Sequence, residues 1–549
     1  HAAECEGHAP ASGARGCGQD ALDFGRCEMN RAWMVSIGAV ALWAGACSSG
    51  GGGSIAPPPP AGPFSNESLN GQYAFSVTGT DASTGAALPF NMVGSFIADG
   101  KGDITSGADD VNIFESGSNE FDFSSGSYTI GGNGHGSLSF VDSAGTHTFS
   151  ITMVSNSNGY LIYQPSNLLT AANGSFALQN LNSFQQSGIS GNYAFDLSGS
   201  DVNGAPESAV GQLVSNGGGV LSGFADDNDD ATINNNVAGA APISGNYGAD
   251  PTHASDLSTF GRGLFNIDGV TGVFYIVGPN QVKFMETTSG GTLAGDAFLQ
   301  TSIPTTAAGI SGGFVFVMGG SAVASAGTTG PLARGGKFSA SSGSLSSIIV
   351  DTNDAGMQSN LSPTTTGTYT IDPSGDGRGT ATYTVSGVKD PFSYVFYMIS
   401  PTQAFIQDQS LDIVEDGSMY AQGSSTISAS SLAGNYAIDW SGVAVLDGGK
   451  EVGEEDVLGQ GTLSSSAALT GNVDINEFAT GAQATGVPLT ATLKLASDPT
   501  SHNILTITLD TNPSGQVTAF AYIAANNNIL ILTTQTTRIA AGVLNLQPQ

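Results

Sequence analysis

The residues of this chain that could do chemistry are mostly carboxylates and amides, and one pair of them recurs. An Asp-x-Asn triplet occurs four times, as Asp110 with Asn112, Asp226 with Asn228, Asp351 with Asn353, and Asp474 with Asn476. Asp and Asn side chains bond to their own backbone two residues further on and tolerate left-handed backbone. The triplet therefore predicts a turn at the end of a strand. Because carboxylate and amide oxygens also suit hard cations, a calcium or sugar site is the alternative interpretation.

The second copy of the triplet lies in a short acidic run. Five oxygen-bearing side chains follow one another there: Asp226, Asp227, Asn228, Asp229 and Asp230. This density of donors makes the run the best single candidate for binding calcium. We expect no other cofactor.

Signals for catalysis are poor. Beyond residue 47 the chain has four histidines, none at metal-binding spacing: His135, His147, His253 and His502. The phosphate-binding P-loop and the dinucleotide-binding glycine fingerprint are missing. We therefore assign no catalytic residue and expect a protein that is not an enzyme. A polysaccharide-acting hydrolase with paired carboxylates is the catalytic alternative, because carboxylates are plentiful.

The triplets belong to a longer pattern that is written four times. An opening motif, Leu69-Asn-Gly-Gln-Tyr73-Ala-Phe75 in the first copy, returns from Ile189, Ile310 and Leu432, at a spacing of 120–122 residues. An apolar residue followed by Gln closes each copy, at Gln179, Gln300, Gln422 and Gln547. Solenoid and propeller repeats are roughly 20–50 residues long, so this period indicates whole domains in tandem. We expect β-domains at 68–181, 188–301, 309–423 and 431–549.

Strand signals run through every copy. Tyr73, Phe75 and Val77 alternate with polar residues, which is the pattern of a half-buried strand. In the first copy we count eight strands, at 72–78, 91–98, 103–112, 121–130, 136–142, 146–154, 159–164 and 174–180. The sequence therefore predicts an all-β protein in which each domain is an eight-stranded up-and-down barrel, because closure removes exposed edges. The alternative is a β-sandwich of the immunoglobulin-like type.

The front of the chain reads as an export signal. A basic start at Met29-Asn-Arg31, an apolar run and small residues before Cys47 are typical of a secretory signal, and the cysteine makes it similar to a bacterial lipoprotein signal. We expect a signal peptide at 29–46, a lipid on Cys47 and a Gly/Pro-rich tether over 47–67. A plain secretory signal is the alternative. Residues 1–28 do not fit the signal, and we expect them to be upstream sequence translated from a wrong start.

The chain is strongly acidic, with a net charge of −33 and only 13 basic residues. Nucleic acid is not expected as a partner, because phosphate binding needs clusters of Lys and Arg. No cysteine follows Cys47, so the domains have no disulfides, although export would permit them. The expected partners are the membrane, through the N-terminal lipid, and a glycan or protein at the cell surface.

Parts of the pattern resemble a known group. The opening motif, Gly94-Ser-Phe96, the Asp110 triplet, Gly126-Ser-Tyr128 and Gly134-His-Gly136 together resemble acidobacterial-type tandem-repeat surface lipoproteins, a group without an assigned activity. The resemblance covers all four copies and implies a location at the outer membrane or cell surface. At the level of topology alone, the expected meander is similar to the calycin barrels of lipocalins and avidins, and no ligand motif of theirs is carried over.

Together these features predict a lipid-anchored protein of the cell envelope that acts as a non-catalytic binding, adhesive or structural module. A second hypothesis takes each barrel as a carrier of a small apolar ligand, lined by the inward Tyr73 and Phe75 and their counterparts. The polysaccharide hydrolase is the third hypothesis.

Overall fold

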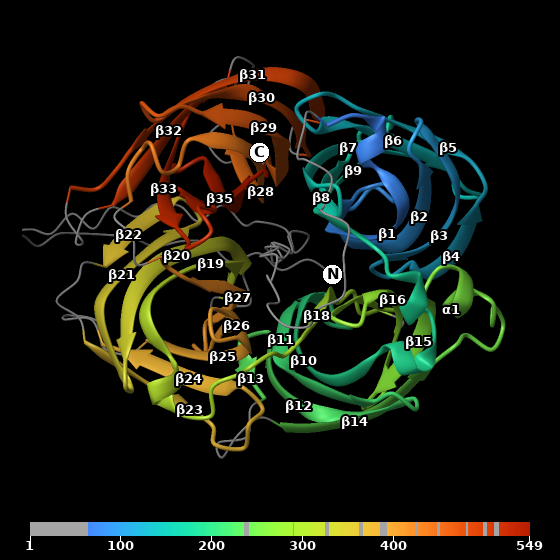
Figure 1. Ribbon diagram of the computed structural model, residues 1–549, viewed down its shortest axis with the longest axis horizontal. Coiled ribbons are helices and arrows are strands. Elements are labelled where there is room, and N and C mark those ends of the chain that lie inside the picture. Colours follow the sequence, from blue (N-terminus) through green and yellow to red (C-terminus); the bar gives the residue numbers. More distant parts are fainter. Residues whose placement is uncertain are drawn as a thin grey trace, which may run out of the picture. The chain divides into compact units, whose positions relative to one another are not determined.

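The computed structural model describes residues 64–548, apart from 235–240, 289, 324–328, 362–365, 385–391, 424–426, 447–450, 479–480, 498–501 and 510–514. The expected upstream segment 1–28, signal peptide, Cys47 and most of the tether lie outside the described residues. The described chain is built almost wholly from antiparallel strands (Figure 1). No helix among the described residues is long and apolar enough to cross a membrane.

The strands form four groups that follow the four sequence copies. The first group is β1 (Asn70–Asp81), β2 (Leu88–Asp99), β3 (Asp103–Ile113), β4 (Gly117–Phe123), β5 (Gly126–Ile130), β6 (His135–Val141), β7 (Thr146–Ser155), β8 (Asn158–Tyr163) and β9 (Thr170–Leu178). The second group is β10 (Ser190–Ser200), β11 (Pro206–Asn216), β12 (Val220–Asp229), β13 (Thr232–Ile233), β14 (Ala241–Gly248), β15 (Arg262–Ile267), β16 (Val270–Gly278), β17 (Gln281–Glu286) and β18 (Ala294–Leu299).

The third and fourth groups continue the series. The third is β19 (Ser311–Val323), β20 (Thr329–Ser341), β21 (Ser344–Asp354), β22 (Met357–Leu361), β23 (Gly367–Ile371), β24 (Arg378–Tyr383), β25 (Phe392–Ser400), β26 (Gln403–Asp408) and β27 (Ile413–Ala421). The fourth is β28 (Gly434–Leu446), β29 (Glu451–Leu463), β30 (Ala468–Glu477), β31 (Ala482–Lys494), β32 (Asn503–Leu509), β33 (Gly515–Ile523), β34 (Ile529–Thr533) and β35 (Arg538–Leu546). The described helices are short: α1 (Asp256–Thr259) and the 3-10 turns η1 (Asn66–Ser68), η2 (Leu181–Ser183), η3 (Gln186–Gly188) and η4 (Ala307–Gly309).

Each group closes into an eight-stranded barrel. In the first group the sheet order is β2-β1-β9-β8-β7-β6-β5-β3-β4, and β2 also pairs with β3, which closes the sheet and leaves β4 as an extra strand. The second and third groups repeat this order, and β28 to β35 form the fourth closed barrel. The prediction of four tandem eight-stranded barrels is confirmed. The sandwich alternative is wrong, because each sheet pairs with itself.

One strand expected in the first barrel is two strands. The segment 121–130 breaks at Ser124 and Ser125. β4 pairs with the later part of β3, from Gly107, whereas β5 pairs with its first residues, Asp103 and Ile104. In the fourth barrel the corresponding strand, β31, runs unbroken, and a register shift keeps it paired with β30.

Aromatic side chains pack in the barrel interiors and explain the glycine of a recurring Gly-x-Phe or Gly-x-Leu step. Tyr73 and Phe75 are at most 1% exposed, and Tyr73 stacks on Phe96 with ring centroids 5.5 Å apart. The ring of Phe75 lies so close to Gly94 that a Cβ at Gly94 would come within 2.5 Å of it. The same contact joins Phe195 to Gly211 and Phe316 to Gly336. These glycines are needed because a ring packs directly on the backbone.

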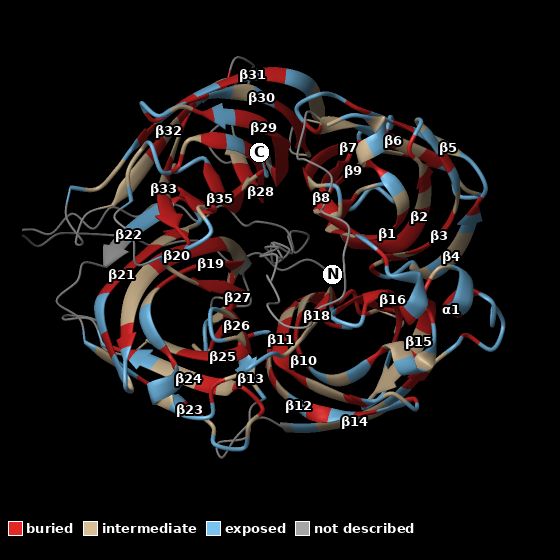
Figure 2. Cartoon of the chain, in the orientation of Figure 1, coloured by how far each residue is buried: buried red, intermediate tan, exposed pale blue. Residues whose placement is uncertain are grey.

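The opening strands are buried on both faces, as Figure 2 shows for β1 and β10. Outward positions are fully buried at Ala74, Ala194, Val315 and Ala437. They pack against the next barrel: β1 and β2 against β16 and β17, β10 and β11 against β25 and β26, β19 and β20 against β33 and β34, and β28 and β29 against β7 and β8. The expected half-buried opening strand is therefore wrong, because a neighbouring barrel covers its outer face. Every barrel contacts the next through the same strands, and the fourth contacts the first.

Candidate functional site

The four Asp-x-Asn triplets lie at the contacts between successive barrels, which we call junctions. β3, β12, β21 and β30 carry one triplet each, close to the end of the strand. The triplet residues are paired within the sheet, as Asn112 is with Asn91, rather than forming the turn expected from the sequence. Because they lie at four different junctions, the triplets do not meet in one site.

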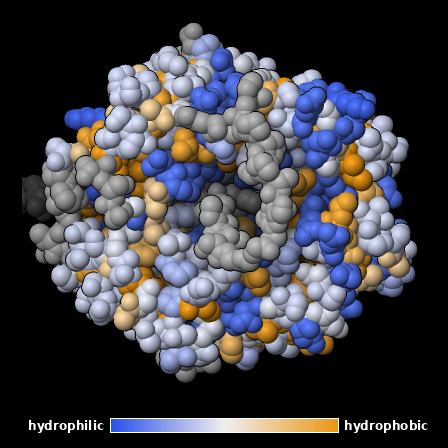
Figure 3. Space-filling model, in the orientation of Figure 1, coloured by the Kyte–Doolittle hydropathy of each residue, from blue (hydrophilic) through white to orange (hydrophobic). Residues whose placement is uncertain are grey.

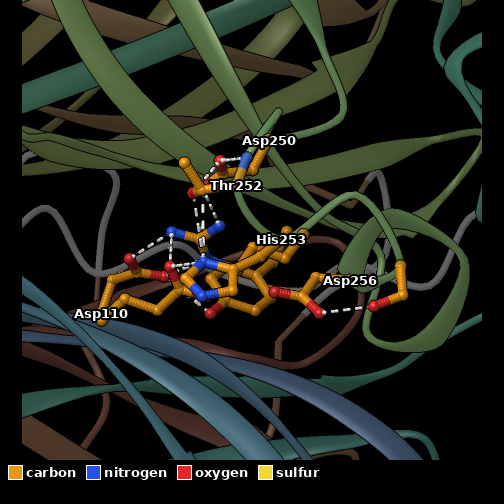
Figure 4. Close-up of polar contacts among 9 residues, drawn as sticks. Asp110, Asp250, Thr252, His253 and Asp256 are labelled. Carbon is orange, nitrogen blue, oxygen red and sulfur yellow. Dashed lines mark hydrogen bonds and ion pairs between the residues drawn. The ribbon is translucent and has the colours of Figure 1, made fainter.

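At the first junction the triplet carboxylate holds an arginine of the second barrel (Figure 4). Arg262 donates from Nε and Nη2 to the two carboxylate oxygens of Asp110, each at 2.8 Å. The hydroxyl of Tyr275 donates to Asp110 at 2.7 Å, and Arg262 also reaches Asp250 at 2.9 Å. Asp110 and Arg262 are both 3% exposed. A buried bidentate pair is specific in geometry, and the loss of either partner leaves a buried charge uncompensated.

The second junction repeats this geometry with other residues. Arg378 donates from Nε and Nη2 to Asp226 at 2.7 and 2.8 Å. The hydroxyl of Tyr397 donates to the same carboxylate at 2.8 Å. Asp226 is fully buried. Tyr275 and Tyr397 therefore have the same role at the first and the second junction.

Histidine takes the place of arginine at the other two junctions. Nε2 of His502 lies 2.8 Å from Asp351, which also accepts from the Tyr522 hydroxyl at 2.6 Å. At the junction of the fourth barrel with the first, Nε2 of His135 lies 3.1 Å from Asp474. Although burial raises it, hydrogen bonds from His135 and neighbouring groups hold the pKa of Asp474 below its ordinary value.

The basic partners stand at one equivalent position in their barrels. Arg262 is paired across the sheet with Tyr275, Arg378 with Tyr397, and His135 with Thr152. Three of them lie between two glycines, as Gly134-His-Gly136, Gly261-Arg-Gly263 and Gly377-Arg-Gly379. The sequence analysis used Gly134-His-Gly136 only for the resemblance to surface lipoproteins and assigned His135 no function. A basic residue recurring between glycines was the signal that identifies the partners of three of the four aspartates, Asp110, Asp226 and Asp474.

The asparagines of the triplets bind backbone of the next barrel. Nδ2 of Asn112 donates to the carbonyls of Glu286 and Gly291, at 2.8 Å each. The other three triplets do the same: Asn228 to Asp408 and Ile413, Asn353 to Thr533, Gln535 and Arg538, and Asn476 to Tyr163 and Thr170. An amide nitrogen donates two hydrogens whereas a carboxylate donates none, which explains why this position is Asn in every copy.

The closing glutamines also cross the junctions. Gln179 donates to the carbonyls of Phe260 and Ile276, at 2.9 and 2.7 Å. Its counterparts act alike: Gln300 on Asp376 and Met398, Gln422 on Ile523, and Gln547 on Asn133 and Met153. Both recurring polar features of the sequence therefore hold one barrel against the next. The calcium interpretation of the triplets stays a prediction.

The remaining acidic residues of the second triplet lie apart from Asp226. Asp227 accepts from Asn234 at 3.0 Å, and Asp230 is exposed with a left-handed φ of 48°. Burial, and then the charges of Asp227 and Asp229, raise the pKa of Glu207 to about 9. Burial and neighbouring carboxylates raise the pKa of Asp229 to about 6. This mutual repulsion is the local feature that a bound cation would relieve.

The cavities inside the barrels are small. The first, second and third barrels enclose about 10, 50 and 30 Å³. Sites for drug-sized ligands are typically about 300–1,000 Å³. The hydrophobic side chains that the sequence predicted to face inward therefore fill these three interiors.

A further cavity of about 50 Å³ is lined by residues of all four barrels, including the carboxylates of Asp196, Asp296 and Asp439. Burial raises the pKa of Asp196 and of Asp439 to about 7. A space of this size holds a few water molecules but not a sugar ring. A cleft of about 390 Å³ is lined by Lys337, Gln422 and His502, among others, and we assign it no role.

Among the residues that the structure describes, two groups of side chains each place three donor atoms for a metal within 4.8 Å of one another. Glu120, His253 and Asp256 form one at the first junction, where Glu120 already lies 2.8 Å from His253 and 3.0 Å from Arg262. The other group is Asp109, Asp142 and His147, in the first barrel. The sequence predicted neither, because residues far apart in the chain meet there, through packing between barrels in one group and within the first barrel in the other.

No protein-family model and no curated protein sequence matches the chain. Among solved structures it is similar to a single-residue mutant of the vaccine antigen transferrin binding protein B from Haemophilus parasuis Hp5, with a TM-score of 0.19 and 10% identity over 64% of this chain and 76% of that one. It is also similar to intact Ap-TbpB with its N and C lobes, with a TM-score of 0.17 and 8% identity over 70% and 82% of the two chains. Likeness at this level carries no argument about function, and the fold assignment rests on the strand pairing.

Proposed function

We propose that the protein is a lipid-anchored, non-catalytic module of the cell envelope in which four barrels act as one body for binding or for structural support. The observation that carries the proposal is the repetition of one set of contacts at every junction, from the fourth barrel to the first as well. Independent carriers or adhesins on a string would need no such contacts, because a flexible linker is enough to join them.

The anchor is supported by the sequence alone. The expected signal at 29–46 ends directly before Cys47, and the expected tether over 47–67 combines Gly/Ser with four consecutive prolines. Such a segment would hold the first barrel away from the membrane by a semi-rigid spacer. A location at the outer membrane or cell surface, and a glycan or protein partner there, are parts of this proposal.

Two other functions have less support. A carrier of apolar ligands needs an internal cavity, and the cavities in the first three barrels have volumes of at most about 50 Å³. A hydrolase needs two carboxylates in a cleft that admits a polysaccharide, about 5–10 Å apart. The cavity beside Asp196, Asp296 and Asp439 is too small for that substrate. On the face seen in Figure 3, apolar residues form small separate groups among neutral and hydrophilic ones, which favours a polar partner.

Fractionation of cells that express the protein tests the anchor. We expect the chain to sediment with membranes and to accumulate as a precursor when the lipoprotein signal peptidase is inhibited by globomycin. A Cys47→Ser variant is the matched control and should be found in the soluble fraction or as unprocessed precursor. A wild-type chain that is processed in the presence of the inhibitor and stays soluble would remove the anchor from the proposal.

Thermal unfolding tests the second part, that the four barrels act as one body. A chain of barrels joined through buried junctions should unfold in fewer transitions than it has barrels, and a junction variant should separate them. Four independent transitions in the wild type would contradict this part while leaving the anchor untouched.

A further inference from the structure

The first barrel contains a buried carboxylate that has no counterpart in the other three. Asp109 in β3 pairs across the sheet with Gly94, which faces the interior ring of Phe75, so the Asp109 side chain also points inward. Asp109 is fully buried, and neither of its carboxylate oxygens has a hydrogen-bond partner among the described residues. A buried carboxylate without donors is costly, so its retention calls for a partner.

The residues that precede the triplet aspartate in the other barrels are apolar: Ala225, Val350 and Val473. Val350 and Val473 are at most 1% exposed, so this position belongs to the hydrophobic core there. The fold itself therefore does not require a carboxylate at this position. Asp109 is specific to the first barrel.

Two further metal-donor side chains, from the hairpin of β6 and β7, lie close to Asp109. Nε2 of His147 in β7 lies 3.0 Å from Oδ2 of Asp142, which precedes that strand, and both side chains are at most 9% exposed. Donor atoms of Asp109, Asp142 and His147 all lie within 4.8 Å of one another. Two ligands of a tetrahedral zinc ion are about 3.3 Å apart, given bonds of about 2.0–2.1 Å. The Asp142–His147 pair thus has close to the required separation, and the Asp109 carboxylate would have to approach.

A second contact orients the imidazole. Nδ1 of His147 lies 3.0 Å from the Tyr163 hydroxyl, and the ring of Phe140 lies against His147 with centroids 5.1 Å apart. Without an ion, Nε2–H of His147 donates to the Asp142 carboxylate, and the Tyr163 hydroxyl donates to Nδ1. An ion on Nε2 would replace that proton, and a hydrogen bond from Nδ1–H to the Tyr163 oxygen would hold the metal-binding tautomer. In this arrangement Tyr163 is a positioning residue, and Nε2 faces the two carboxylates.

We propose that Asp109, Asp142 and His147 bind one divalent transition-metal ion inside the first barrel, with Zn²⁺ as the probe. An imidazole with two carboxylates is a donor set for Zn²⁺ and its neighbours, whereas Ca²⁺ and Mg²⁺ take oxygen ligands. The three side chains leave a fourth position for water. Binding to the folded chain alone would stabilise the barrel. The site is independent of the proposed function, since it belongs to one barrel and not to the junctions.

The charges around Asp109 agree with this assignment. Burial, and then the carboxylates of Asp142, Asp110 and Asp122, raise the pKa of Asp109 well above its ordinary range. A cation bound beside these carboxylates would offset their mutual repulsion.

The experiment titrates Zn²⁺ into the full chain after alkylation of its cysteines, all four of which lie at or before residue 47. The test variant is Asp109→Val, which places the residue of the third and fourth barrels at this position. The matched control is Asp122→Asn, which removes an exposed charge close to Asp109 and keeps all three donors. The Glu120–His253–Asp256 group is present in every sample and cancels in the comparison.

We expect the wild type and Asp122→Asn to bind one more equivalent of Zn²⁺ than Asp109→Val, or to bind it at least about tenfold more tightly. Zn²⁺ should raise the melting temperature of these two chains more than that of Asp109→Val. His147→Val, with the residue found at Val517 in the fourth barrel, serves as a second variant if the first does not fold. Equal stoichiometry, affinity and melting shift in the wild type and a folded variant would overturn the proposal.

Discussion

The carboxylate of Asp474, in the fourth barrel, lies 3.1 Å from Nε2 of His135, in the first barrel. This is the junction that joins the end of the repeat to its start. Asn476 and Gln547 of the fourth barrel add hydrogen bonds to the backbone of the first, at Tyr163 and Met153 among others. The fourth copy therefore uses its triplet as the other three do, on a barrel that precedes it in the chain.

The second junction predicts a large loss of stability for one aspartate and none for a neighbour. Asp226→Asn leaves the guanidinium of Arg378 without its bidentate carboxylate, which should cost roughly 3–5 kcal/mol. Asp230→Asn changes an exposed residue with left-handed backbone that Asn tolerates, and should stay within about 0.5 kcal/mol. Urea denaturation of the two variants makes the comparison. Equal losses in both would show that the triplet aspartate has no special role.

The glycines of the Gly-x-Phe or Gly-x-Leu step predict different tolerance of alanine in different barrels. In Gly211→Ala the new Cβ would come within 2.4 Å of the Phe195 ring, in a filled interior. In Gly461→Ala the nearest atom is the end of the Leu469 side chain, at 2.8 Å, which can move. We expect Gly211→Ala to cost about 1–3 kcal/mol and Gly461→Ala clearly less, by thermal or urea unfolding. The opposite order would contradict the packing account of these glycines.

The buried carboxylate of Asp439 predicts an unusual pH dependence. Burial raises its pKa to about 7, whereas the carboxyl of Asp in an unfolded chain has a pKa of about 3.9. Between these two values the folded chain holds the extra proton, so the free energy of unfolding falls as pH rises from about 4 to about 7. Asp439→Asn keeps an oxygen for the hydrogen bond from Asn173 and removes the contribution of Asp439 to the pH dependence of the free energy of unfolding.

The variant should therefore be more stable than the wild type at pH 8, by roughly 2–4 kcal/mol, and the difference should shrink towards pH 5. Urea denaturation at pH 5, 6.5 and 8 measures it, with Asp230→Asn as an exposed control. A stability difference that does not change with pH would mean that Asp439 titrates normally.

The sequence predicted the number, class and closure of the barrels because alternation of apolar residues and short turns are local signals. It also marked Asp110, Asn112 and Gln179 as recurring, but assigned the triplet to a turn or a calcium site. Their partners, such as Arg262, lie in another barrel, and no local pattern shows which barrels touch. The same reason hid the group of Asp109, Asp142 and His147, which strand pairing brings together.

The burial of the opening strand on both faces was not predicted, for a related reason. Ala74 lies between Tyr73 and Phe75, and its small side chain gives no signal of burial in the sequence. In the structure Ala74 packs against the second barrel. A residue can recur because it packs against the next barrel or because it packs inside its own barrel. The sequence of one copy does not distinguish these two causes.

The most direct test of the central claim is a double-mutant cycle on His135 and Asp474. His135→Ala, Asp474→Asn and the double variant are compared by urea denaturation, with His253→Ala combined with Asp474→Asn as the control pair, since His253 lies at the first junction. Contacts between the fourth barrel and the first predict a coupling energy of about 1 kcal/mol or more for the first pair and additive effects for the control. Additivity within about 0.5 kcal/mol for His135 and Asp474 would contradict the closure of the contacts between the four barrels.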